Sequence, residues 1–240
     1  MFCTLPKALI VRRLADGGSG CCNAFALPQL TEMCRNFQAL VCGPGLGQAE
    51  ESLVVLQALL ATGLPLVLDA DGLNLLAAHP ECLPAQPAAL ILTPHPGEMA
   101  RLQNGFGLEA TGNRLEQAQA LAHRTGCVVV LKGCRSVVAA PDGQAHLNLS
   151  GCPALATAGS GDVLAGICGA FLAQGRDAYQ SAALAVFLHG LTGEILRPTG
   201  SRELSPMICR TLCLKPGPHW EPISDLANRK ADDLSRKNSA

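Results

Sequence analysis

The sequence predicts an α/β fold, a doubly wound and mostly parallel sheet flanked by helices. Short apolar runs rich in β-branched residues alternate with segments of helical periodicity. The runs are continuously apolar, as expected of strands that helices cover on both faces. The expected strands span residues 39–42, 64–68, 89–92 and 127–131, and the expected helices span residues 49–61, 72–78, 114–123, 162–173 and 177–196. This order indicates right-handed βαβ units.

A fifth apolar run, residues 136–140, departs from this alternation. Only a Gly-Cys-Arg turn separates it from Lys132, and Pro141-Asp142-Gly143 ends it. A connection this short joins antiparallel strands, so we expect a hairpin with the run at 127–131.

Length and composition indicate one compact domain. The chain has 240 residues, of which 48% are hydrophobic and 15% charged, enough to build a large buried core. From Arg197 onward prolines interrupt the pattern, and the end of the chain is polar. We therefore expect a domain over residues 1–214 and a disordered tail over 215–240.

Charge and cysteine patterns exclude several classes of protein. The eighteen basic residues are balanced by nineteen acidic ones and are not clustered into a stripe, and aromatic residues make up only 3% of the chain. Nucleic acid is therefore not an expected partner. Near the start of the chain, positive charges come after the apolar run at residues 8–11, which is the reverse of a secretory signal. No apolar stretch is long enough to cross a bilayer. The twelve cysteines are scattered and form no Cys-x-x-Cys pair, which favours reduced thiols. We expect a cytoplasmic protein without a membrane partner.

The stretch 158–166, Ala-Gly-Ser-Gly-Asp-Val-Leu-Ala-Gly, carries the clearest chemistry. It predicts a tight turn that opens a helix, whose unpaired N–H groups favour an anion. Asp162 follows in the first turn, beside the anion, where a base for phosphoryl transfer to a hydroxyl is needed. The alternative is a plain helix start with Asp162 in a position favourable to the helix dipole.

Two further loops follow predicted strands, at the sheet edge where α/β proteins collect ligands. Residues 43–47, Gly-Pro-Gly-Leu-Gly, allow close approach of a ligand or form a plain turn. Residues 69–74, Asp-Ala-Asp-Gly-Leu-Asn, offer two carboxylates that bind Mg²⁺, cap the next helix, or both, and capping by Asp71 is the favoured interpretation.

The next two strand ends carry a histidine and a lysine. Two prolines hold the backbone around His95, which places it to touch a ligand, although a lone histidine is often structural. Glu98 begins the following helix. Lys132 leaves a buried strand at the same sheet edge, and a lysine extending along the surface is the alternative.

In order and spacing, five motifs resemble the ADP/ATP-dependent NAD(P)H-hydrate dehydratases of the ribokinase-like superfamily. They begin at Gly43, Leu68, Leu92, Val130 and Ala154, and the resemblance covers roughly residues 5–195. It implies repair of NADH and NADPH whose nicotinamide ring has taken up water, the 6S hydrates NADHX and NADPHX. A nucleotide, ADP or ATP, activates the ring hydroxyl, ADP giving AMP and phosphate, and Mg²⁺ is implied with it.

The resemblance also implies site residues. Asp162 matches the catalytic and substrate-contacting aspartate, and Gly45, Gly47 and His95 match hydrate-binding positions. Glu98 stands where related kinases hold an acid linked to Mg²⁺. The implied nucleotide-binding residues are Lys132, Gly133, Cys134, Arg135, Ser136, Gly159, Ser160 and Gly161.

The chain departs from the family pattern in three places. Family members usually carry a further strand and a Gly-Ala segment before the point that matches Pro6, so an N-terminally truncated domain with an open substrate groove is expected. Cys152 replaces a common asparagine, and the usual closing pattern is missing after Arg197. The alternatives are a small-molecule kinase of the same superfamily and an inactive nucleotide-binding remnant. We also expect a homo-oligomer.

Overall fold

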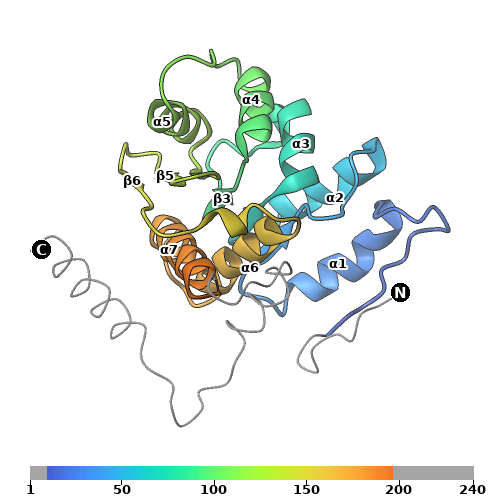
Figure 1. Ribbon diagram of the computed structural model, residues 1–240. Helices are drawn as coiled ribbons and strands as arrows, with labels where there is room; N and C mark the ends of the chain where they lie inside the picture. The colour runs from blue at the N-terminus through green and yellow to red at the C-terminus, as the bar shows by residue number, and fades with distance from the viewer. Residues whose placement is uncertain (1–9, 197–240) are drawn as a thin grey trace, which may run out of the picture.

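A computed structural model describes residues 10–196 as one six-stranded sheet with helices on both faces (Figure 1). The strands are β1 Leu40–Cys42, β2 Leu66–Leu68, β3 Leu90–Leu92, β4 Val128–Leu131, β5 Val137–Ala139 and β6 Ala145–Leu147. The helices are α1 Leu27–Cys34, α2 Glu50–Leu60, α3 Ala70–Ala78, α4 Pro96–Gly105, α5 Arg114–Thr125, α6 Ser160–Leu172 and α7 Ala178–Leu196. The expected tail at 215–240 lies outside the described residues.

The strands follow one another across the sheet in chain order, β1 to β6. The first four are parallel, and β4, β5 and β6 pair antiparallel. The predicted α/β class and the predicted hairpin are therefore confirmed. The structure adds β6 and α1, which the sequence pattern did not indicate. Both are short and have few buried residues, one in α1 and none in β6, so neither carries a continuous apolar run.

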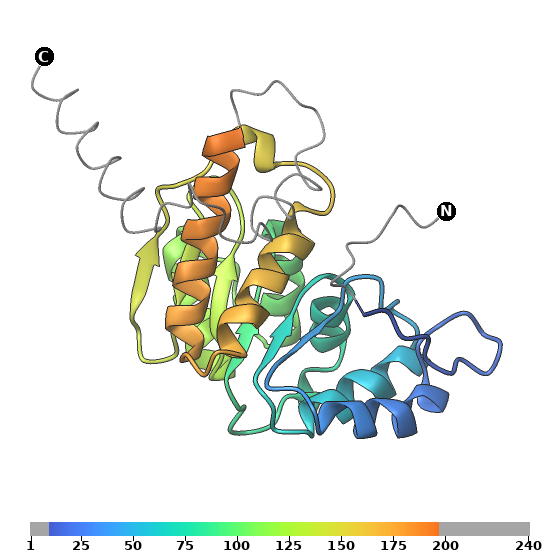
Figure 2. The ribbon, with the colours of Figure 1, turned by 90° about the horizontal axis from the view of Figure 1, so that it is seen from below.

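The sheet separates two hydrophobic cores. Leu66, Leu68, Leu90 and Leu92 face the core that α2, α3, α4 and α5 complete. The intervening Val67 and Ile91 face the second core, against α6 and α7. Figure 1 shows α6 and α7 on the opposite side of the sheet from α3, α4 and α5. Figure 2 shows α6 and α7 side by side. Because both faces are covered, the strands are apolar throughout, as expected.

Local signals in the sequence account for α5. Asn113 accepts hydrogen bonds from the N–H groups of Leu115 and Glu116, while Glu116 accepts one from the Asn113 N–H, a complete capping box. Gly126 ends the helix in the left-handed conformation at φ 69°. The beginning of α5 is therefore fixed, which matters for the loop that it contacts.

The cysteines that the structure describes are all free thiols, in agreement with the sequence. Burial raises the pKa of Cys42, Cys127 and Cys168 to about 12, so these three remain neutral core residues. Within residues 10–196, no helix combines the length and apolar character needed to span a bilayer.

Candidate functional site

The carboxyl ends of β2 and β4 meet the N-terminus of α6. A Cβ added at Gly161 would lie 3.3 Å from Lys132 Nζ and 3.7 Å from Asp69 Oδ2. The glycine-rich turn therefore rests directly against two charged side chains, one after β2 and one after β4. The expectation that motifs at the strand ends gather at one edge is correct for these segments.

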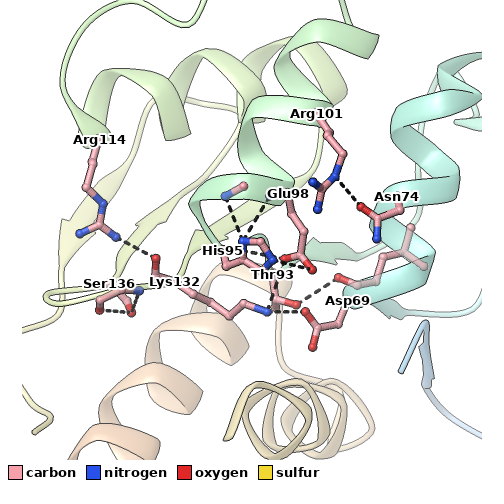
Figure 3. Close-up of polar contacts among 12 residues, drawn as sticks. Asp69, Asn74, Thr93, His95, Glu98, Arg101, Arg114, Lys132 and Ser136 are labelled. Carbon is pink, nitrogen blue, oxygen red and sulfur yellow. Dashed lines mark hydrogen bonds and ion pairs between the residues drawn. The ribbon is translucent and has the colours of Figure 1, made fainter. Parts of the chain in front are cut away.

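Lys132 forms a buried cluster with two carboxylates (Figure 3). Its Nζ lies 2.6 Å from Asp69 Oδ1 and 3.7 Å from Glu98 Oε2. The exposed fractions of the side chains are 17% for Lys132, 1% for Asp69 and 6% for Glu98. The lysine thus extends along the sheet edge into the cluster, and it neutralises one of two buried negative charges.

Asp69 was named in the sequence only as a metal ligand or cap, yet it is the closest partner of Lys132. It directly follows a strand that is buried at every position. A carboxylate in such a place needs a partner, because burying an unpaired charge is costly. That argument points to a cation nearby, although only the tertiary structure identifies it as Lys132.

His95 caps α4 and is locked to Glu98. Its Nδ1 accepts hydrogen bonds from the N–H groups of Gly97 and Glu98, at 2.9 and 3.3 Å, so the ring carries a hydrogen on Nε2. That nitrogen lies 3.4 Å from Glu98 Oε1, while Glu98 Oε2 accepts the His95 N–H at 2.7 Å. With 51% of its side chain exposed, His95 is both a helix cap and a ring open to solvent.

The loop at residues 43–47 packs onto the end of β2. Gly43 has φ 130°, and a Cβ there would lie 1.7 Å from the Asp69 carbonyl oxygen, so glycine is required. Asp71 accepts the Gly47 N–H at 3.0 Å and the Gln48 amide at 2.7 Å. The expectation that Asp71 caps α3 is therefore wrong, because the helix begins at Ala70 and its second residue reaches across to this loop.

The glycine-rich turn at the start of α6 is supported from α7. Gly159 has φ 80°, and Ser160 Oγ lies 3.0 Å from Nε2 of the buried His189. Burial lowers the pKa of His189 to about 4, so the ring is neutral at pH 7. The Ser160 side chain therefore faces the protein interior. His189 was not singled out in the sequence, since a lone histidine in an apolar helix carries no motif.

The first turn of α6 remains available to a ligand. Ser160 N–H donates to the Thr157 carbonyl, and among the described residues no side chain caps the helix. Within residues 10–196, the N–H groups of Gly161 and Asp162 are therefore the unpaired donors of this turn. Asp162 itself is exposed beside them. This arrangement favours an anion with a carboxylate next to it.

Residues 132–136 form the turn between β4 and β5. Ser136 Oγ lies 3.3 Å from the Gly133 nitrogen and 3.1 Å from its carbonyl oxygen, which closes the turn. Cys134 and Arg135 lie at its exposed tip, and Arg135 has φ 54°. Arg114 holds this turn from α5, although the sequence pattern did not single it out.

A family model described as NAD(P)H-hydrate dehydratase matches residues 17–210. The chain belongs to this dehydratase family. A bifunctional NAD(P)H-hydrate repair enzyme Nnr from Gloeobacter violaceus is 51% identical over 160 residues, which is 67% of this chain and 31% of that protein. An ADP-dependent (S)-NAD(P)H-hydrate dehydratase from Neisseria meningitidis is 40% identical over 167 residues, 68% of this chain and 56% of the relative. The chain thus spans about a third of the length of the Nnr relatives.

Solved structures agree with the family. The ADP/ATP-dependent NAD(P)H-hydrate dehydratase from Bacillus subtilis, co-crystallised with ATP and Mg²⁺, superposes with a TM-score of 0.59 at 33% identity, covering 72% of this chain and 63% of that one. A ribokinase-like superfamily protein from Enterococcus faecalis gives a TM-score of 0.69 at 30% identity, with coverages of 77% and 64%. The ribokinase-like fold implied by the sequence is therefore confirmed.

Proposed function

We propose that this chain carries out the nucleotide-dependent dehydration of the 6S hydrates of NADH and NADPH. The observation that carries the proposal is the uncapped start of α6, with Asp162 beside it, held against the Lys132–Asp69 pair in a member of the dehydratase family. Phosphoryl transfer needs an anion site and an adjacent base, and this turn supplies both.

In the proposed reaction, the oxygen of the ring hydroxyl attacks the terminal phosphorus of ADP, and Asp162 accepts the proton of that hydroxyl. The bond from that phosphorus to the bridging oxygen breaks, and AMP leaves. The carbon–oxygen bond of the resulting phosphate ester then breaks with loss of a ring proton, which restores the double bond. The balance is hydrate plus ADP giving NAD(P)H, AMP and phosphate. The unpaired N–H groups of Gly161 and Asp162 would hold the transferred phosphate.

Charge at the site supports a divalent cation that enters with the nucleotide. Lys132 supplies one positive charge, whereas Asp69, Glu98 and Asp162 are all acidic. Residues 10–196 contain no cluster of three metal-binding side chains. Separate carboxylates of this kind fit Mg²⁺, which is usually held by one or two carboxylates and by the phosphates themselves. When bound, Mg²⁺ would neutralise phosphate charge. Glu98 would be its ligand only by giving up contacts to His95 or Lys132.

The remaining site assignments are part of the same proposal. Gly45, Gly47 and His95 would line the hydrate site, since their loops follow β1 and β3 at the edge where the turn of α6 lies. The turn at 132–136 would bind the nucleotide. Homo-oligomer formation and a cytoplasmic location remain expectations from the sequence.

The test is a direct assay on this chain with the purified 6S hydrate of NADH. Recovery of the absorbance of the reduced nicotinamide should require both Mg²⁺ and ADP or ATP. AMP or ADP formed from the nucleotide should match the NADH recovered, one for one. Equal rates with and without nucleotide would rule out the mechanism, and a stable phosphorylated product without NADH would indicate a kinase instead.

A further inference from the structure

The guanidinium of Arg114 is inserted against the turn that joins β4 to β5. Nη1 donates to the carbonyl oxygens of Cys134 at 2.6 Å and Arg135 at 3.4 Å. Nη2 donates to the carbonyl oxygens of Leu131 at 3.0 Å and Lys132 at 3.1 Å. Four carbonyl groups of a five-residue segment therefore converge on one side chain, an arrangement that a planar fork of donors permits.

The clamp that Arg114 forms on the carbonyl groups of residues 131–135 fixes an unusual backbone conformation. Gly133 has φ 148° and Arg135 has φ 54°, and non-glycine residues rarely adopt the left-handed region. A Cβ at Gly133 would lie 2.9 Å from Arg114 Nη2, so the glycine makes room for the guanidinium. The contacts of Arg114 offset the strain at Arg135 and direct the carbonyl dipoles toward α5.

The clamp also places positive charge beside the turn. Across residues 10–196 no carboxylate lies within ion-pair distance of Arg114. Its Nε is buried without a hydrogen-bond partner among the same residues. In this part of the chain, carbonyl dipoles alone balance the charge, so it still favours an anion nearby. Arg114 begins α5, where the capping box of Asn113 and Glu116 fixes its backbone.

We propose that Arg114 is a positioning residue that holds the turn at 132–136 in the conformation that binds the phosphates of a nucleoside di- or triphosphate. This inference rests on the proposed function, because it assumes that the turn is the nucleotide site. Lys132 benefits as well: its carbonyl is fixed by Arg114 while its ammonium is fixed by Asp69, so the clamp sets the start of the loop from both sides.

The test compares Arg114→Lys and Arg114→Ala with the control Arg124→Ala. Arg124 lies in the last turn of the same helix and donates to one carbonyl, that of Phe106, at 3.3 Å. ADP binding is measured by calorimetry, and turnover is measured with the hydrate. We expect both Arg114 variants to raise the Kd of ADP at least about tenfold, since several charge-assisted hydrogen bonds are lost. The kcat at saturating ADP and the KM of the hydrate should change little.

Two further measurements separate positioning from a general loss of stability. Guanidinium ion at millimolar concentration should restore ADP affinity in Arg114→Ala and leave Arg124→Ala unchanged. Hydrogen exchange should accelerate over residues 131–136 in Arg114→Ala and not in the control. If the wild type binds ADP, two results would overturn the role of Arg114 without affecting the proposed function. They are unchanged hydrogen exchange in Arg114→Ala, and unchanged ADP affinity in both Arg114 variants. A wild type that fails to bind ADP would overturn the proposed function, and with it the nucleotide role of Arg114.

Discussion

Replacing Lys132 by Met should expose how strongly the site depends on its buried cation. The substitution keeps the volume and removes the charge, leaving two carboxylates whose exposed fractions are 1% for Asp69 and 6% for Glu98. Breaking a buried ion pair from one side costs about 3–5 kcal/mol, because the remaining charge stays desolvated. Asp69→Asn should cost less, about 1–3 kcal/mol, since Lys132 keeps Glu98 at 3.7 Å.

The double variant Lys132→Met/Asp69→Asn tests the reasoning directly. It removes the orphaned charge at position 69, so it should be more stable than Lys132→Met alone, by about 2 kcal/mol. Free energies of unfolding come from urea titrations at pH 7, with the exposed Arg35→Met as control, expected within about 0.5 kcal/mol of wild type. If the double variant is no more stable than Lys132→Met, the ion pair does not carry the predicted energy.

Three other predictions concern the base, the buried histidine and the glycine loop. Asp162→Asn should lower kcat by about 10² to 10⁴ while the Kd of ADP, measured by calorimetry, changes little; near-normal turnover would reduce Asp162 to a helix-start residue. Because the pKa of His189 is lowered from 6.5 to about 4, the native state binds fewer protons than the unfolded chain in this range. The free energy of unfolding, from urea titrations, should therefore fall as pH drops from about 6.5 to about 4, by about 3 kcal/mol more than in His189→Gln; parallel profiles would contradict this. Gly43→Ala should cost more than about 3 kcal/mol because its Cβ meets the Asp69 carbonyl, whereas Gly45→Ala, with open space around it, should cost about 1–2 kcal/mol; equal melting temperatures would refute the packing argument.

Local patterns in the sequence were sufficient for most of the fold. Continuous apolar runs located β1 to β5, and the short turn after Lys132 predicted the antiparallel pairing of β4 and β5. They did not reveal β6, whose three residues are partly or fully exposed. A strand of that kind is stabilised by pairing with its neighbour, which periodicity does not register.

The motifs of the candidate site could be predicted from the sequence, but the contacts between its side chains could not. The glycine-rich turn, His95 and Lys132 carry local signatures. Asp69, Arg114 and His189 act through contacts to residues 63, 17–21 and 29 positions away, so nothing in their immediate sequence identifies the partner. Asp71 shows the opposite error. Its position near a helix start suggested a cap, but the neighbouring strand end offered the Gly47 N–H instead.

The long-range contacts of the site have a consequence for how the protein folds. The Lys132–Asp69 pair joins segments 63 residues apart, and the Ser160–His189 pair joins α6 to α7. Such contacts form only when distant strands and helices have assembled, which slows folding. A partly folded chain would hold the individual turns without the close approach of Gly161 to Lys132. A ligand that binds this junction therefore binds the native state alone and should raise the melting temperature in proportion to the logarithm of its concentration.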